Sequence, residues 1–369
     1  MASGSPSPNP FKPSAGVSPP ELIGRQDLLD SWQRALDEGP GSPGRLAIFT
    51  GQRGVGKTVM LNEIGDRAQR EGWHVINLTA TPGLLERLDA EAVRLWRVEE
   101  PPAAAKVTGI SVAGVGGVSF ERSGELSTNV RTTLTNLADA LGRRGSGVLV
   151  TLDEIHSAPT PELRELAAIT QHLMREDRQF ALVMAGLPAS VSGLLSDGAL
   201  TFMRRADRHE LTAVDVLDVE LAYDKTIRDN GRTMEATLVR SAATASRGYP
   251  YLIQLIGYHI WNRAHGERID ADSVERGIDD ARERLGVLVH ATALKDLSDM
   301  DRRFLHAMAV DDAESQVADL SRRLAKDRYW VNNYRRRLIA ARVVEEAGRG
   351  RLRFTIPYMR EYLRGEGAP

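Results

Sequence analysis

Residues 46–61 read LAIFTGQRGVGKTVML and decide the fold. A short apolar run leads into an octet, residues 51–58, that contains three glycines and is followed by a helical pattern. The octet fits G-x-x-x-x-G-K-[ST], in which glycines allow successive backbone N–H groups to point inward toward an anion. The amino end of the following helix adds a positive dipole end at the same place. The stretch therefore predicts a strand, a phosphate-binding loop and a helix, in that order.

The octet also indicates a nucleotide and its metal ion. In a loop of this kind, Lys57 is expected to contact the β- and γ-phosphates of ATP, and the Thr58 hydroxyl is expected to bind Mg²⁺. Other residues of the loop and the helix start are expected to surround the phosphates: Gly51, Gln52, Arg53, Gly54, Val55, Gly56 and Val59. The sequence therefore predicts ATP and Mg²⁺ as cofactors.

An acidic pair follows a second apolar strand, in GVLVTLDEIH at residues 147–156. Asp153 and Glu154 stand at the carboxyl end of this strand, where open parallel sheets bind ligands. Asp153 is placed to hold Mg²⁺ through water, and Glu154 to orient or deprotonate the attacking water. His156 is expected behind this pair or at the surface. Behind the phosphate-binding loop, the pair predicts an ATPase with Lys57, Asp153 and Glu154 among its catalytic residues.

The rest of the chain predicts the architecture around these motifs. Residues 21–212 alternate apolar β-rich runs with helical patterns, which indicates a three-layer α/β domain around a parallel sheet. Within it, residues 106–122 alternate apolar and small residues around a Gly-Gly pair and predict an inserted β-hairpin. Residues 213–288 are helical in pattern throughout. Residues 1–20 hold six prolines and five serines, and their few apolar groups predict a disordered tail.

Charge and composition limit the partners and the compartment. The 48 basic and 50 acidic residues give a net charge of −2, so no overall field attracts the chain to nucleic acid or to an anionic membrane. The sequence has no cysteine, which excludes disulfides, thiolate nucleophiles and thiolate zinc sites. No apolar run approaches the length that spans a membrane. These features predict a cytoplasmic protein with no membrane partner.

A segment ahead of the octet resembles part of a known ATPase family. LIGRQDLL, residues 22–29, is similar to the box that precedes the phosphate-binding loop in AAA+ and STAND ATPases. Ile23, Gly24 and Arg25 match this box, which implies that they lie against the adenine. The spacing between the box and the octet fits the family as well.

A second resemblance lies after the sheet domain. Gly248-Tyr249-Pro250 resembles the Gly-x-Pro element of the helical lid in STAND and archaeal-type ATPases, where it closes over the nucleotide. The alternative is a plain helix start, because proline is favoured in the first helical turn. Residues 21–288 are thus similar to AAA+ P-loop ATPases of the origin-initiator-like and STAND-like branch. The resemblance makes residues 213–288 the lid and implies that Pro250 lies near the nucleotide.

The same resemblance implies an arginine finger just before the last core strand. Arg204 and Arg205 stand there, and in this family such an arginine reaches the γ-phosphate bound to the neighbouring subunit. We therefore expect a homo-oligomer in the ATP state. The alternative is a solvated basic helix end, which the helix dipole favours.

Two polar groups of the family pattern are missing. The strand after the acidic pair ends in Ala185 and Gly186, where the family places the polar residue called sensor 1. No arginine stands near Tyr251, where the family places the arginine called sensor 2. These departures predict a slow ATPase that acts as a switch.

Residues 296–369 predict a third unit. Three helical patterns and two short strands indicate a winged helix, which is a helix-turn-helix variant. Residues 321–364 hold 13 basic and 4 acidic residues, a patch that is typical of phosphate-backbone binding. Duplex DNA is therefore an expected partner, through the following residues: Tyr329, Asn332, Asn333, Arg336, Arg349, Arg351 and Arg353.

Two functions follow from this organisation and remain open at the level of sequence. In the first, the nucleotide state of an AAA+ protein controls assembly and DNA binding through the winged helix. In the second, the chain is a STAND-like signalling switch, whose winged helix clamps the nucleotide site or binds a protein partner.

Overall fold

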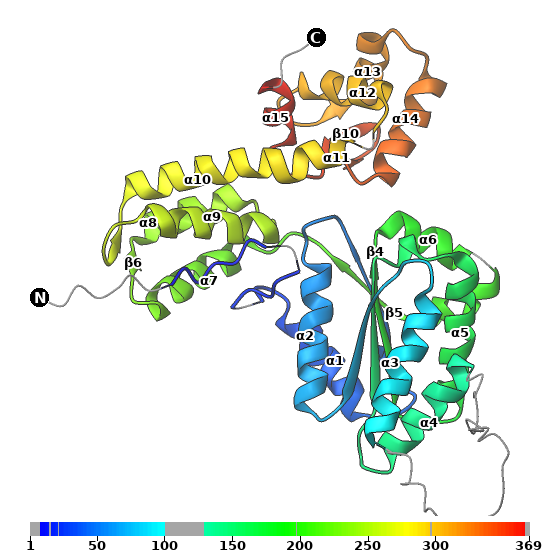
Figure 1. Cartoon of the computed structure of the whole chain (residues 1–369). Coiled ribbons are helices and arrows are strands. Elements are labelled where there is room, and N and C mark those ends of the chain that lie inside the picture. Colours follow the sequence, from blue (N-terminus) through cyan, green and yellow to red (C-terminus); the bar gives the residue numbers. More distant parts are fainter. Residues whose placement is uncertain are drawn as a thin grey trace, which may run out of the picture.

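Three units follow one another along the chain in the computed structural model: a sheet domain, a helical lid and a small C-terminal domain (Figure 1). The hairpin predicted at residues 106–122 lies outside the described residues. The structure describes residues 8–14, 16–20, 22–99, 129–196, 198–295 and 297–365.

The sheet domain is built on parallel strands in the order β2-β3-β4-β1-β5. The strands are β1 (Leu46–Gly51), β2 (His74–Thr79), β3 (Val148–Asp153), β4 (Phe180–Gly186) and β5 (Asp207–Leu211). Because they all run in one direction, the carboxyl ends of β1 and β3 lie at the same edge of the sheet, on either side of β4. This edge brings the octet and the acidic pair together, and the predicted α/β fold is confirmed.

Helices cover both faces of the sheet and complete the three layers (Figure 1). Along β1, Ala47 and Phe49 pack into the core beneath α1 and α2, whereas Leu46 and Ile48 pack into the core on the opposite face. Burial on both faces explains why the strands are continuously apolar. The helices are α1 (Gln26–Asp37), α2 (Lys57–Arg70), α3 (Leu84–Glu99), α4 (Val130–Gly142), α5 (Thr160–Arg175) and α6 (Pro188–Ser196), with the 3-10 turns η1 (Pro43–Arg45), η2 (Ile155–Ser157) and η3 (Gly198–Arg205).

The lid is helical apart from one short strand pair. Its last helix, α10, continues through a π-helical turn at Gly286–His290 (η4) into α11 (Ala291–Lys295), so it enters the C-terminal domain without a loop (Figure 1). The elements before that turn are α7 (Val216–Asp229), β6 (Thr233–Met234), α8 (Ala236–Ser246), α9 (Pro250–Arg263), β7 (Arg268–Ile269) and α10 (Ala271–Leu285).

The C-terminal domain packs helices and a small antiparallel sheet, β8-β10-β9, around a core of its own. On α14, Val331 and Leu338 are fully buried in this core, which leaves the face that carries Tyr329 exposed. The elements are α12 (Asp299–Ala309), β8 (Ser315–Gln316), α13 (Val317–Leu324), α14 (Arg328–Ala340), β9 (Val344–Glu346), β10 (Arg351–Phe354) and α15 (Met359–Gly365).

The prediction of a disordered tail is wrong for the described part of residues 1–20. Phe11 is only 5% exposed and packs edge-on against Tyr223 of α7, with ring centroids 5.7 Å apart. Gly257 of α9 makes room for this ring, because a Cβ there would lie 2.4 Å from Phe11 Cδ1. Asn9 Nδ2 also donates to Tyr258 O of α9 at 3.0 Å. The high content of proline and serine predicts disorder, but it does not reveal that the single aromatic residue Phe11 attaches the segment to the lid.

Candidate nucleotide site

The octet forms a tight loop between β1 and α2. Gly54 and Gly56 have φ values of 77° and 93°, which residues with a side chain rarely adopt. Gly51 has no room for a side chain, since a Cβ would lie 2.7 Å from Leu211 O of the neighbouring strand β5. Helix α2 then begins at Lys57, so backbone N–H groups at its start face the loop.

Lys57 lies inside the loop and is 6% exposed. Its Nζ donates to Gly51 O at 3.0 Å and to Gln52 O at 2.8 Å. Burial lowers the pKa of this amine, and the carboxylates of Glu154 and Asp153 oppose that shift. The ammonium is therefore held at the centre of the loop, where it can pair with a phosphate.

Thr58 and Asp153 meet between α2 and β3. Thr58 Oγ1 donates to Asp153 Oδ2 at 2.5 Å, and Asp153 Oδ1 accepts from the Glu154 N–H at 2.8 Å. A hydroxyl and a carboxylate are hard oxygen ligands, and Mg²⁺ in nucleotide sites takes one or two such protein ligands beside phosphates and water. The pair therefore fits Mg²⁺, which would neutralise charge on the phosphates when bound.

The lid touches the loop directly, through a contact that sequence reasoning missed. Tyr249 is 3% exposed, and its hydroxyl donates to Arg53 O at 2.6 Å. Gly54 leaves space for this hydroxyl, since a Cβ there would lie 2.1 Å from it. The Tyr251 N–H donates to Gly54 O at 3.2 Å. Burial raises the pKa of Tyr249, so it remains a hydrogen-bond donor.

A cavity of about 260 Å³ lies between the loop and the lid. Among the residues predicted to contact nucleotide, Gly24, Gly51 and Gln52 do not line this cavity. Gly24 instead packs against Val214, since a Cβ on Gly24 would lie 2.9 Å from Val214 Cγ1. Those that do line it are Ile23, Arg25, Arg53, Gly54, Val55, Gly56, Lys57, Thr58, Val59 and Pro250, and Glu154 joins them.

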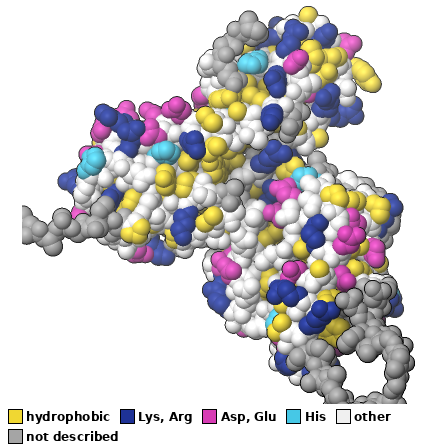
Figure 2. All heavy atoms as spheres, viewed as in Figure 1, with side chains coloured by type: hydrophobic (Ala, Val, Ile, Leu, Met, Phe, Trp, Pro, Cys, Tyr) yellow, Lys and Arg dark blue, Asp and Glu magenta, His cyan; other side chains and the backbone are white. Residues whose placement is uncertain are grey.

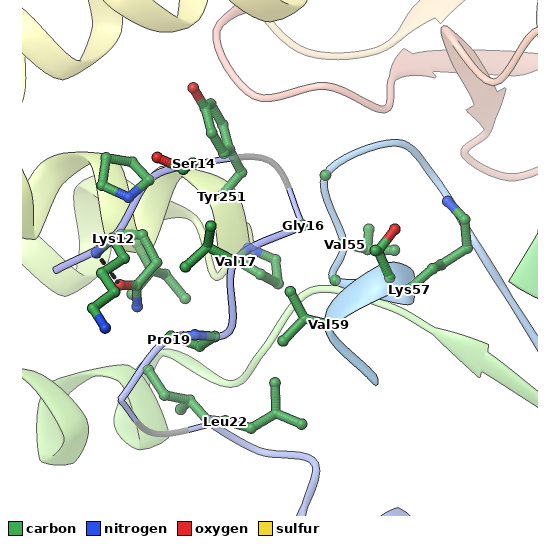
Figure 3. Close-up of a pocket in the computed structure, with 18 of the residues that line it drawn as sticks. Lys12, Ser14, Gly16, Val17, Pro19, Leu22, Val55, Lys57, Val59 and Tyr251 are labelled. Atoms are coloured by element: carbon green, nitrogen blue, oxygen red, sulfur yellow. Dashed lines mark hydrogen bonds between the residues drawn. The ribbon is translucent and has the colours of Figure 1, made fainter. Parts of the chain in front are cut away.

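The N-terminal segment forms another wall of this cavity. Figure 3 shows Lys12, Ser14, Val17 and Pro19 on a segment that runs between α9 and the start of α2. Asn62 Nδ2 of α2 donates to Gly16 O at 2.9 Å, which attaches the segment to that helix. The sequence offered one signal for this wall, the lone aromatic residue of the tail.

The structure does not bring the two candidate finger arginines to the loop of their own chain. Arg204 and Arg205 are exposed on η3, just before β5 begins. Arg205 lines a different cavity with Leu46 and Phe180, the residues that begin β1 and β4. This position is at the amino-terminal edge of the sheet, opposite the edge that carries the octet.

The candidate DNA-contact residues divide into two groups. On α14 the following residues are exposed along one face: Tyr329, which is 80% exposed, Asn332, Asn333 and Arg336. On the two strands and their turn, Arg349 is exposed, whereas Arg351 pairs with Glu314 at 3.2 Å and Arg353 with Glu345 at 2.5 Å. Two of these three arginines, called the wing arginines below because the strand pair would be the wing of a winged helix, therefore have carboxylate partners within the domain.

The fold and the loop define a P-loop ATPase. Residues 21–183 match the family model described as an AAA ATPase domain. Residues 288–363 match a model described as a domain of unknown function (DUF8462). Residues 21–183 therefore form an ATPase domain similar to those of the AAA type. Comparison with curated protein sequences finds no match.

Solved structures of archaeal proteins share this fold over nearly the whole chain. A Walker-type ATPase of Pyrococcus abyssi is 14% identical with a TM-score of 0.67, covering 93% of this chain and 96% of its own. The Aeropyrum pernix ORC2 protein is 14% identical with a TM-score of 0.65, covering 96% of each chain. Cdc6p of Pyrobaculum aerophilum is 13% identical with a TM-score of 0.50, covering 96% and 97%. At these identities the likeness is one of fold.

No helix in the described part of the chain is long and apolar enough to cross a membrane.

Proposed function

We propose that ATP binding and slow hydrolysis control the position of the C-terminal domain and, through it, assembly and DNA binding. The observation that carries this proposal is the short segment Arg247–Tyr251, which joins the end of α8 to the first turn of α9. On one side, Tyr249 and Tyr251 contact the phosphate-binding loop. On the other side, Arg247 pairs with Glu361 of α15 at 3.0 Å. A change in the loop on nucleotide binding therefore acts on a turn that also holds the C-terminal domain.

The contact with the C-terminal domain is well packed. The ring of Tyr358, 8% exposed, lies between the guanidinium groups of Arg247 and Arg282, at 4.0 and 4.6 Å from its centroid. Its hydroxyl donates to Ala245 O of α8 at 2.7 Å. Cation–π contacts to a buried ring with a satisfied hydroxyl stabilise one orientation of the two units, so we expect the lid and the C-terminal domain to move together.

The shape and charge of the C-terminal domain support DNA as the partner. In this proposal its helices and its antiparallel strands serve as a winged helix, with α14 as the recognition helix. Figure 2 shows many Lys and Arg side chains on this domain, at the top of the view. Asn332, Asn333 and Arg336 are exposed. The asparagine amides offer donors and acceptors, and the arginine offers donors, to the base edges in the major groove.

The position of the finger arginines supports the assembly step of this proposal. Arg204 and Arg205 lie at the edge of the sheet away from their own cavity, so their contribution to hydrolysis requires a neighbouring copy of the chain. Slow turnover follows from Ala185 and Gly186, which place no polar side chain at the end of β4. A neighbour that supplies an arginine in the ATP state would then set the rate of hydrolysis.

The test is duplex binding by the full chain, measured with ATP, with ADP and without nucleotide. We expect both the affinity for DNA and the mass of the oligomer to depend on which nucleotide is present. The affinity for DNA should also fall steeply as the salt concentration rises. Arg336→Ala should weaken binding, whereas Lys225→Ala, on the lid helix α7, serves as the control. The proposal would be refuted by an oligomer mass that is the same with and without nucleotide, together with no salt-dependent binding to DNA.

A STAND-like switch that recruits a protein partner is the second candidate, and one observation favours it. The pairs of Arg351 with Glu314 and of Arg353 with Glu345 neutralise part of the wing. The residues that line the nucleotide cavity all precede residue 255, so a direct clamp by the C-terminal domain gains no support. Unchanged DNA affinity after replacing the three wing arginines with alanine would favour this second function.

A further inference from the structure

The space at the end of β4 is filled by an apolar side chain. A Cβ on Gly186 would lie 2.7 Å from Ile155 Cγ1 and 3.2 Å from Val191 Cγ2. Ile155 is 4% exposed and belongs to η2, the turn that directly follows the acidic pair. A polar side chain at Gly186 is therefore excluded by packing, and any group that orients the attacking water must come from elsewhere.

The same turn carries a polar group that reaches the acidic pair. His156 Nε2 lies 3.0 Å from Glu154 Oε2. The imidazole side chain is 21% exposed. Its Nδ1 is buried and has no hydrogen-bond partner among the described residues. The polar contact of this ring is therefore directed at Glu154.

Glu154 faces the nucleotide cavity while it makes this contact. It lines the cavity together with Lys57, and its charge is the first to oppose the lowered pKa of that lysine. Its backbone has a φ of 55°, unusual for a residue with a side chain, and its N–H is held by Asp153 Oδ1 at 2.8 Å. The backbone is thus fixed, and the remaining freedom lies in three side-chain torsions, which the bond to His156 restricts.

We propose that His156 is a positioning residue for Glu154, in place of the polar group that β4 lacks. His156 holds Oε2, and Oε1 is left to accept a proton from water. As the water oxygen bonds to the γ-phosphorus, the bond to the β–γ bridging oxygen breaks and ADP and phosphate leave, with the proton on Glu154. This inference rests on the proposed role of Glu154 as the base.

The test uses the full chain with His156→Ala, His156→Gln and Glu154→Gln, and His265→Ala as an exposed control beyond the far end of α9. Steady-state hydrolysis gives kcat and KM, and titration with a fluorescent ATP analogue gives binding. We expect His156→Ala to lower kcat about tenfold, since one mobile side chain loses its orientation, with KM and analogue binding within about twofold of the parent. His156→Gln keeps an N–H donor and should recover most of kcat.

The outcomes separate this inference from the proposed function. If Glu154→Gln lowers kcat by about a hundredfold or more while His156→Ala leaves it unchanged or raises it, the inference fails and the base assignment stands. If Glu154→Gln retains turnover, both fail. Equal losses of kcat, analogue binding and melting temperature in both His156 variants would show a merely structural role and overturn the proposal. Adding His156→Ala to Glu154→Gln should cause no further loss, because both changes act through one carboxylate.

Discussion

Replacing Phe11 by alanine should release the N-terminal wall of the nucleotide cavity without unfolding the protein. An aromatic side chain buries about 150–250 Å², which at about 25 cal/mol per Å² contributes roughly 4–6 kcal/mol. Phe→Ala replacements in packed sites cost about 3–5 kcal/mol. Ordering the backbone of the segment opposes its docking by about 1–2 kcal/mol per residue. Because Phe11 is the main apolar anchor of the segment, its loss should shift the docking equilibrium toward the released form by about a hundredfold or more.

Hydrogen exchange with peptide-level mass measurement is the direct assay. The Lys12 N–H donates to Gln254 Oε1 at 3.1 Å and the Val17 N–H to Ser14 O at 3.3 Å, so these amides should be protected in the parent and exposed in Phe11→Ala. The affinity for a fluorescent ATP analogue should fall about tenfold, since the residues of one wall leave the cavity together. Phe11→Leu, which keeps most of the apolar area, should lie between the two. Equal exchange of residues 9–17 in the parent and in Phe11→Ala would refute this reasoning.

Three further outcomes are expected. Lys57→Ala should weaken ATP binding by about a hundredfold or more in a titration, because charge-assisted bonds to phosphate contribute about 1.5–3 kcal/mol each; wild-type affinity would contradict the site. Gly248→Ala should lower the melting temperature well beyond Gly231→Ala: both glycines have positive φ, but only at Gly248 would the added Cβ meet a carbonyl oxygen, at 2.0 Å. The hydrogen bond from Arg323 lowers the pKa of the Asp311 carboxyl group. Ionised Asp311 therefore stabilises the fold fully at a pH above the ordinary carboxyl pKa of about 4, and this stabilisation is lost as the pH falls through the lower pKa of the folded state. The stability difference between the parent and Asp311→Asn should therefore shrink in acid melting curves; a difference constant down to about pH 2 would contradict it.

The parts of the site that sequence predicted are those built from contiguous residues or from parallel-strand geometry. The octet contains its own strand end, loop and helix start, so its conformation is local. Thr58 and Asp153 lie far apart in the chain, yet parallel strands place both at one edge of the sheet, and their side chains do meet. The class of the domain and its nucleotide follow from these two elements together.

The parts that sequence missed depend on how separate units pack. The sequence pattern indicates Pro250 and gives no sign of the contact of Tyr249, because the hydrogen bond from its hydroxyl to Arg53 O exists only when the lid folds onto the loop. Phe11 has no neighbours in sequence that mark it as buried; its partners are a glycine on α9 and a tyrosine on α7. In the proposed role of Arg204 its target lies on a second copy of the chain, and no pattern within one sequence specifies such a contact.

The continuous path from α10 through the π-helical turn into α11 has a mechanical consequence. Residues 271–295 form one rod, roughly 35 Å long at about 1.5 Å per residue, with the lid around its first half and the C-terminal domain at its end (Figure 1). A rotation of the lid by about 10° would therefore displace the far end by about 6 Å. That displacement is comparable to one helical turn, enough under the proposed function to carry α14 out of register with a groove of the DNA. A small angular change at the phosphates thus becomes a translation large enough to separate two bound states.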